Sequence, residues 1–440
     1  MGKYLARNGI DSYIVELPGH GQSPLRYEVE ACYENSRAAL EEIIRLFSLH
    51  RGSISLVGHS FGAMIIARIG LLDTRFRCSV LVGPGFEANL GTTAPRNALF
   101  VTAERDYSLV RESVRRMILS ASAGRIDREG ELIGSFEAGN ARQWWVAPGV
   151  AHVSLIYNGD VYCRIREWIA RSMLRPDLLP EGSVKYSSLG VALGLAGASV
   201  VLISIVVLWL ASSVFPQAPG PVLFVSTKPA FELLVLLAGW LVSLNVLRFF
   251  VPLRFLRLEE GEVIASVFFL SGFLSTAAWF AFRCKFEAKH LRRALRPILV
   301  AVVSVSFHYL AALTVVSRDL YQLTLTLDRA WRSGVIALAS LPLFLVTEAV
   351  VRGFQRVHGK HPLRYLLALL VGVTFLAVVF LSSIVQDVRL IRFFPFFFVF
   401  VVAVETYSCI LYEFGKTPFL TATFQCLMFA WIMGAGFAIR

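Results

Sequence analysis

The chain has 440 residues, of which 56% are hydrophobic, and this share exceeds that of an ordinary soluble domain. The formal net charge is +12, but the first part of the chain has no basic patch interleaved with aromatic residues, which disfavours a nucleic-acid-binding protein. The six cysteines form no C-x-x-C pair, so they predict free buried thiols and neither a metal site nor a disulfide framework.

Hydrophobic residues are unevenly distributed along the chain. Residues 1–175 mix polar and apolar types, whereas apolar runs of about 20 residues, long enough to span a bilayer, recur from residue 188 onward. Pro and Gly residues in 176–187 indicate a linker. We therefore expect a soluble domain at 1–175, a linker at 176–187 and a multi-pass transmembrane domain at 188–440.

Strands alternate with helices in the predicted soluble domain. In chain order we expect a helix at Gly2–Asn8, a strand at Ser12–Leu17, a helix at Glu30–Leu49, a strand at Ser53–Val57, a helix at Phe61–Leu72, strands at Cys78–Val82 and Asn97–Thr102, a helix at Leu109–Leu119, a strand at Arg142–Val146 and a helix at Asp160–Leu174. This alternation predicts an α/β fold with a parallel sheet, whose functional sites lie beyond the carboxyl ends of the strands.

Residues Gly58–Gly62 read G-H-S-F-G between an apolar strand and an apolar helix. A G-x-S-x-G run in this context indicates a sharp strand-to-helix turn that exposes a nucleophilic serine, here Ser60. We expect both Gly58 and Gly62 to lack space for a side chain, because strand and helix crowd each other there. The alternative is an ordinary serine in a glycine-rich turn.

Two further residues follow predicted strands. Asp106 lies in the turn at the carboxyl end of the strand Asn97–Thr102, and His152 follows the last strand. A serine hydroxyl needs an imidazole to take its proton, and a carboxylate orients that imidazole, so we expect Ser60, Asp106 and His152 to converge. Glu104 is the second candidate for the acid. The alternatives are a solvated turn aspartate and a surface histidine.

The chain order serine, acid, histidine resembles that of the α/β-hydrolases of the esterase, lipase and thioesterase type, and the likeness covers residues 1 to about 175. Pro18-Gly19-His20-Gly21-Gln22-Ser23 resembles another element of that family. The resemblance implies that Phe61 supplies a backbone N–H to the oxyanion hole. His59 and His20 are expected to shape the pocket and support a loop rather than to act as bases.

The resemblance also implies that three strands precede the first helix, and this sequence opens at that helix. We expect the resulting sheet to be N-terminally truncated, with Ser12–Leu17 displaced or paired directly to Ser53–Val57. Either the start codon is assigned too late and the gene extends upstream, or the gene is a decayed remnant. The intact serine, acid and histidine favour the late start.

The second half predicts an all-α transmembrane bundle of about eight spans: 188–214, 230–251, 262–282, 297–317, 334–351, 363–384, 391–412 and 417–438. Lys and Arg divide evenly between the two sides of such a bundle. The densest basic clusters, 283–296 and 352–364, fall on the side opposite the soluble domain. This favours an extracytoplasmic soluble domain on a multi-pass protein of a bacterial cell membrane.

Polar residues within the predicted spans point to a special site, because charge inside a bilayer is costly. His308, Glu348 and Glu405 stand out, and Arg352 follows Glu348 by one helical turn, so the two can pair. Thr347–Gly353 resembles the E-E-x-x-x-R-G motif of CAAX proteases and bacteriocin-processing membrane proteins. Thr347, Ile384 and Gln425 depart from that family's pattern, which implies a degenerate, proteolytically inactive relative. The alternative is an unrelated bundle with a local ion pair.

Three functional hypotheses result. The first is a membrane-anchored serine hydrolase that cleaves a carboxylic ester or thioester of a small molecule or a lipid, without a cofactor or metal. The second is a non-catalytic transporter or scaffold that carries a vestigial hydrolase domain. The third, a protease site in the helical half, is disfavoured because its histidines are absent. Sequence alone specifies neither the substrate nor the oligomeric state.

Overall fold

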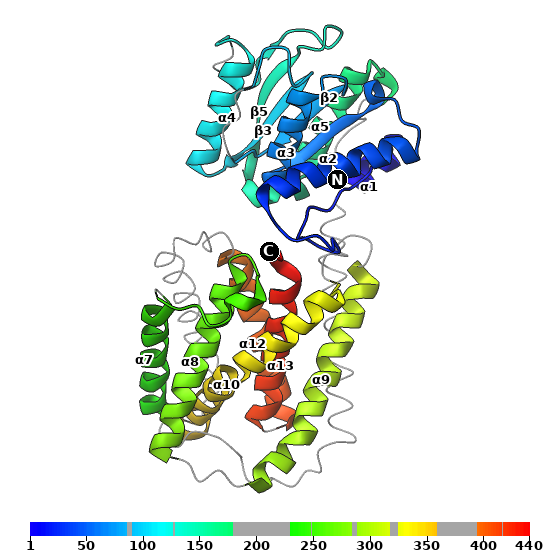
Figure 1. Cartoon of the computed structure of the whole chain (residues 1–440). Helices are drawn as coiled ribbons and strands as arrows, with labels where there is room; N and C mark the ends of the chain where they lie inside the picture. Colours follow the sequence, from blue (N-terminus) through cyan, green and yellow to red (C-terminus); the bar gives the residue numbers. More distant parts are fainter. Residues whose placement is uncertain are drawn as a thin grey trace. The chain divides into compact units, whose positions relative to one another are not determined.

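The computed structural model describes residues 1–85, 90–125, 128–178, 229–247, 249–283, 288–316, 324–358, 394–415 and 417–440. Contacts divide the chain into two compact units (Figure 1). The first contains Met1–Pro18 and Tyr27–Gly190, and the second contains Gly19–Arg26 and Val191–Arg440.

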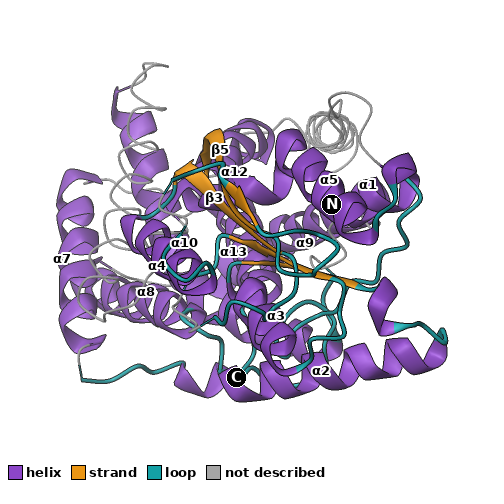
Figure 2. Ribbon diagram, turned by 90° about the horizontal axis from the view of Figure 1, so that it is seen from above, coloured by secondary structure: helices purple, strands orange, loops and turns teal. Residues whose placement is uncertain are grey.

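The first unit is built on a five-stranded sheet in the order β1-β2-β3-β5-β4. Figure 2 draws the strands in orange and labels β3 and β5. Four strands run parallel: β1 (Ser55–His59), β2 (Cys78–Val82), β3 (Ala98–Arg105) and β5 (Arg142–Ala151). The short β4 (Leu132–Ile133) pairs antiparallel with β5. Parallel strands bring their carboxyl ends to one edge of a sheet, so the residues after β1, β3 and β5 can meet there.

Helices cover both faces of this sheet, because successive side chains of β2 pack against different helices. Val80 and Val82 pack in the apolar cluster that includes α1 (Gly2–Arg7) and α5 (Gly159–Met173). Leu81, which points the other way, packs in the cluster of α3 (Phe61–Leu72) and α4 (Ser108–Ala121). All five β2 residues are buried, as expected for a parallel strand covered on both faces. Outside these layers, α2 (Val29–Leu46) packs on α3.

Most of the elements expected in this unit are present, with boundaries shifted by a few residues, but the strand expected at Ser12–Leu17 is wrong. Those residues form no strand, and Tyr13 and Ile14 are 43% and 70% exposed. In the described sheet β1 is an edge strand, so the expected pairing of Ser12–Leu17 with it is also wrong. Ser12–Leu17 has the alternation of a strand, but a β-strand also needs backbone hydrogen bonds to a neighbouring strand, and this segment is not part of the described sheet.

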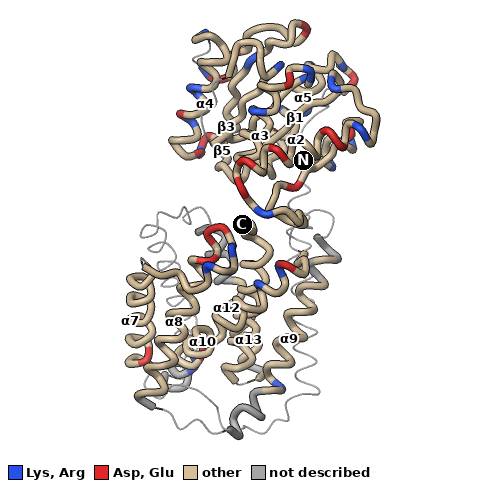
Figure 3. Tube along the Cα trace, in the orientation of Figure 1, with Lys and Arg blue, Asp and Glu red and all other residues tan. Residues whose placement is uncertain are grey.

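The second unit is helical. Its long helices are α7 (Pro229–Leu247), α8 (Gly261–Arg283), α9 (Ala288–Val316), α10 (Leu327–His358), α12 (Phe394–Gly415) and α13 (Pro418–Gly436). Residues of α7, α8, α10 and α13 share one apolar core, in which Phe268 stacks on Phe429 with ring centroids 4.2 Å apart. Lys, Arg, Asp and Glu are sparse along these helices, whereas they occur throughout the first unit (Figure 3).

Four helices in the described part of the chain are long and apolar enough to cross a membrane: Ala230–Leu247, Gly261–Ala281, Leu327–Arg352 and Pro418–Gly436. The structure therefore supports four spans and not the eight expected. The span expected at 297–317 falls on α9, whose apolar part, Leu295–Leu310, is shorter than a span. The span at 391–412 overlaps α12 and begins outside the described residues, and those at 188–214 and 363–384 lie outside them.

The Gly19–Arg26 segment clusters with the second unit through Arg329, a buried residue in the first turn of α10. The Arg329 guanidinium donates to the carbonyl oxygens of Gly19 at 2.7 Å and Gly21 at 2.9 Å. It also donates to the carbonyls of Gly434 at 2.6 Å and Phe437 at 2.9 Å, at the end of α13. A cation at a helix C-terminus satisfies carbonyls that have no partner inside the helix.

Candidate functional site

Ser60 lies in the sharp turn between β1 and α3. Its φ of 53° and ψ of −117° are rarely adopted by a residue with a side chain. The Ser60 N–H donates to the Val82 carbonyl oxygen at 2.7 Å, which fixes the turn to the neighbouring strand. Strain of this kind costs of order 1–3 kcal/mol and persists where the surrounding structure enforces it. The turn therefore holds the Ser60 side chain beyond the end of β1.

The two glycines around Ser60 differ in their surroundings. A Cβ at Gly58 would lie 2.4 Å from the backbone oxygen of Gly62, so this position excludes every side chain, as expected. A Cβ at Gly62 would meet no atom within 4 Å, so the expectation of a clash at Gly62 is wrong. The crowding occurs because the strand at Gly58 approaches the first-turn backbone of α3, and the Cβ position of Gly62 points away from this contact.

Ser60, His152 and Asp106 lie in one chain of hydrogen bonds. His152 Nε2 is 3.1 Å from Ser60 Oγ, and His152 Nδ1 is 2.8 Å from Asp106 Oδ1. The Asp106 side chain is fully buried and that of His152 is 12% exposed. His152 begins a short 3₁₀ helix (His152–Tyr157) directly after β5, and Asp106 follows β3. Residues 92 positions apart thus meet at the carboxyl edge of the sheet.

The structure separates Asp106 from its alternative, Glu104. Asp106 Oδ1 also accepts the Tyr107 N–H at 2.9 Å, and Oδ2 accepts the Ala103 N–H at 3.2 Å, which fixes the carboxylate against His152. Glu104 Oε2 instead accepts the Gly149 N–H at 2.6 Å. Glu104 therefore tethers the end of β5 and does not reach the imidazole.

His59, the last residue of β1, contacts His152. Its Nε2 is 3.2 Å from the carbonyl oxygen of His152, and the two ring centroids are 5.0 Å apart. Burial, together with the neighbouring His152, lowers the pKa of His59 to about 4. His59 is therefore neutral near pH 7 and its Nε2–H donates to the His152 carbonyl, which holds the backbone of that residue in place.

Sequence reasoning missed two neighbours of His152. Gly83 has a φ of +56°, and a Cβ there would lie 2.9 Å from His152 Cε1, so only glycine leaves room for the imidazole. The Tyr107 ring centroid lies 5.7 Å from that of His152. The Gly83-Pro84-Gly85 run after β2 is typical of a turn, but no local pattern indicates which side chain fills the space beside Gly83.

Phe61 opens α3, and the first N–H groups of an α-helix have no partner inside the helix. The positive end of the helix dipole lies at the same place, which favours an anion beside Ser60. In the described part of the chain, no group of three or more His, Cys, Asp or Glu side chains could hold a metal ion.

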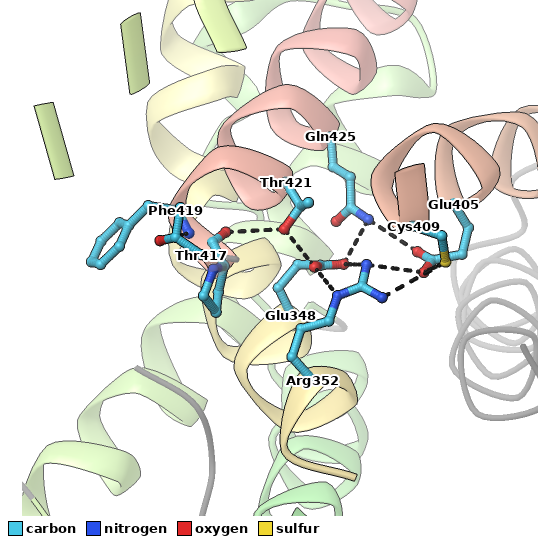
Figure 4. Close-up of polar contacts among 9 residues, drawn as sticks. Glu348, Arg352, Glu405, Cys409, Thr417, Phe419, Thr421 and Gln425 are labelled. Carbon is cyan, nitrogen blue, oxygen red and sulfur yellow. Dashed lines mark hydrogen bonds and ion pairs between the residues drawn. The ribbon is translucent and has the colours of Figure 1, made fainter. Parts of the chain in front are cut away.

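The polar residues predicted in the helical unit also meet. Arg352 pairs with Glu348, Nε to Oε2 at 2.9 Å, and both side chains are 1% exposed. Glu405 from α12 and Gln425 from α13 join them (Figure 4). His308 lies apart from this pair: its Nδ1–H donates to the Ser304 carbonyl at 2.7 Å, and its ring packs on Tyr407 and Phe424.

Residues 2–183 match the model of the Alpha/beta hydrolase family. The first unit is accordingly an α/β-hydrolase domain, and the helical region follows it. The match ends before the helical unit, so the resemblance of Thr347–Gly353 to CAAX proteases is not shown. Comparisons with curated proteins and with solved structures give no match.

Proposed function

We propose that the α/β-hydrolase domain is a serine hydrolase that cleaves a carboxylic ester or thioester, with Ser60, His152 and Asp106 as its catalytic triad. The observation that carries the proposal is the continuous hydrogen-bond chain from Asp106 Oδ1 through the His152 ring to Ser60 Oγ. Both distances suit proton transfer and orientation of the imidazole.

In the acylation step, Ser60 Oγ forms a bond to the substrate carbonyl carbon while its proton moves to His152 Nε2. Asp106 holds the Nδ1–H and stabilises the imidazolium that forms. The Phe61 N–H donates to the developing oxyanion; removal of one such donor costs roughly 10²–10³ in rate. The carbon–oxygen or carbon–sulfur bond of the substrate then breaks as the His152 proton passes to the leaving alcohol or thiol, which leaves the acyl group on Ser60 Oγ. Water, deprotonated by His152, attacks this acyl ester, and the proton returns to Ser60 Oγ as the acid is released.

The four apolar helices support a second part of the proposal, that the helical unit anchors the hydrolase domain in a membrane. An anchored site acts on acyl esters of lipids or of small molecules near the bilayer. Attachment to a bacterial membrane and an extracytoplasmic position of the domain remain predictions from the distribution of basic residues. The degenerate CAAX-protease ancestry of the helical unit likewise remains a prediction from Thr347–Gly353.

The proposal is tested by hydrolysis of chromogenic acyl esters and of acyl thioesters by the full-length protein in detergent micelles. Ser60→Ala is expected to abolish turnover. Ser154→Ala is the matched control, because this exposed serine lies two residues after His152 and is expected to leave turnover unchanged. Activity that survives Ser60→Ala would overturn the triad, and an inactive wild-type protein would favour a non-catalytic role for the domain.

A further inference from the structure

A polar cluster in the helical unit, separate from the proposed hydrolase triad, carries an uneven charge. It consists of Glu348 and Arg352 on α10, Glu405 and Cys409 on α12, and Thr421 and Gln425 on α13 (Figure 4). Two carboxylates face one guanidinium, which is also packed over the Tyr412 ring at 4.7 Å. With both glutamates ionised, the described cluster therefore has an excess of one negative charge.

Glu348 is fully satisfied as an ionised carboxylate. Its Oε2 accepts Arg352 Nε at 2.9 Å and the Thr421 hydroxyl at 2.5 Å. Its Oε1 accepts Arg352 NH2 at 3.2 Å and Gln425 Nε2 at 2.9 Å. The two contacts with Arg352 form a bidentate ion pair, which Glu405 does not make with this guanidinium. Glu348 is therefore the carboxylate that forms the closer ion pair with Arg352.

Glu405 has weaker partners. Gln425 Nε2 donates to its Oε2 at 3.0 Å, and among the described residues Oε1 has two longer contacts, with Arg352 NH2 at 3.4 Å and with the Cys409 sulfur at 3.5 Å. A proton on Oε1 keeps every one of these contacts, because that O–H can donate to the sulfur while the second lone pair still faces Arg352. The Glu405 side chain is also 21% exposed, against 1% for Glu348.

We propose that Glu405 is a proton-binding site of the helical unit, with the Glu348–Arg352 ion pair as its fixed counter-charge. When Glu405 binds a proton the cluster is neutral. When it releases the proton, one uncompensated negative charge lies among α10, α12 and α13, and such a charge in a low-dielectric interior is costly. Proton release therefore loosens the packing of α12 against α10 and α13.

Other titratable groups near α12 do not supply the missing positive charge in the described structure. Cys409 and Tyr412 lie on α12 itself, and α10 and α13 contribute Glu348, Arg352 and the uncharged Gln425 and Thr421. His308 on α9 contacts α12 through the Tyr407 ring, two residues from Glu405, and in the described structure it does not contact the carboxylates of the cluster. Proton uptake at Glu405 neutralises the cluster and leaves the bidentate Glu348–Arg352 pair intact.

The test is pH-difference infrared spectroscopy of the full-length protein in detergent micelles, which reports the C=O stretch of a protonated carboxyl group. A band that disappears on raising the pH is expected in the wild type and is lost in Glu405→Gln. Glu232→Gln is the matched control, because Glu232 is a buried carboxylate on α7 of the same unit, and this variant is expected to retain the band. A band unchanged in Glu405→Gln overturns the proposal.

A second variant keeps the test decisive if Glu405→Gln does not fold. Gln425→Met removes, at similar side-chain length, the amide that donates to both Glu405 Oε2 and Glu348 Oε1, so the cluster with both carboxylates ionised loses two hydrogen bonds. The pH at which the band disappears is then expected to rise by about one unit or more. An unchanged pH contradicts the proposal. Loss of the band with added Na⁺ or K⁺ at constant pH also contradicts it, because the site would then take a metal cation.

Discussion

Asp106 Oδ1 lies 2.8 Å from His152 Nδ1, although the two residues follow different strands and are 46 positions apart. Glu104, two residues before Asp106, contacts the Gly149 amide instead. β3 and β5 are parallel neighbours, so their carboxyl ends lie side by side. Their register is irregular between Ala103 and Arg105. Of the two acidic side chains, only that of Asp106 contacts the imidazole in the described structure.

The first prediction contrasts these two acids. Asp106→Asn removes the charge that fixes the imidazole tautomer, and kcat for ester hydrolysis is expected to fall by roughly 10³–10⁴. Glu104→Gln is the control, because that carboxylate binds a backbone amide and not His152, and kcat is expected to stay within a few-fold of the wild type. Steady-state kinetics on one ester measure both. Equal losses in the two variants would contradict the assignment of the acid.

The second prediction concerns the strand-to-helix turn. Gly58→Ala places a methyl group against the backbone of Gly62 and Ala63, which cannot move without shifting α3, and should cost about 1–3 kcal/mol or more of unfolding free energy. Gly62→Ala meets no atom and lies within a helix, so it is expected to be neutral or to stabilise by about 0.5–1 kcal/mol. Hydrogen exchange of β1 and β2 amides measures both, and a larger loss in Gly62→Ala would refute the geometry.

The third prediction is the pH dependence that His59 confers. Its pKa is about 4 in the folded chain and about 6.5 when unfolded, so the unfolded chain binds more protons between those values. The free energy of unfolding is therefore unaffected by His59 above about pH 6.5. It decreases as the pH falls from about 6.5 toward 4, by at most about 3 kcal/mol. Hydrogen exchange of the sheet amides across this range should show the slope, and His59→Gln should flatten it. An equal slope in both proteins would exclude His59 as its source.

Much of this fold was predictable, because several signals are local. The helix at Phe61–Leu72 and the strand at Cys78–Val82 have the boundaries expected from their apolar runs, and glycines mark the turns beside them. The positions of Ser60, Asp106 and His152 at strand ends followed from the same pattern. These elements bury side chains against immediate neighbours, so sequence periodicity reports them directly.

Other features depend on partners far away in sequence. Ser12–Leu17 has the composition of a strand, but a strand forms only where a neighbour pairs with it. The contact of Gly19 and Gly21 with Arg329 joins residues about 310 positions apart, and no local pattern marks it. The same holds for the meeting of Glu348, Glu405 and Gln425 on three helices. Pairing of Glu348 with Arg352 was predictable, because they lie one helical turn apart.

The fourth prediction tests the role of Arg329. Arg329→Met leaves the carbonyls of Gly19, Gly21, Gly434 and Phe437 without this donor, and each buried acceptor that stays unsatisfied costs about 1–3 kcal/mol. The thermal unfolding temperature of the full-length protein in micelles is therefore expected to fall markedly. Arg254→Met, at an exposed arginine of the same unit, is expected to leave it unchanged. Equal unfolding temperatures in the two variants would show that Arg329 contributes little.

The central claim, that Ser60 is an activated nucleophile, is tested most directly by covalent trapping. Full-length protein is incubated with a fluorophosphonate, digested, and analysed by mass spectrometry for the modified peptide. The account predicts a single phosphonylated site at Ser60, formed rapidly in the wild type and lost when His152 is replaced by Gln. An unmodified Ser60 in folded protein, or a principal adduct on another residue, would contradict it.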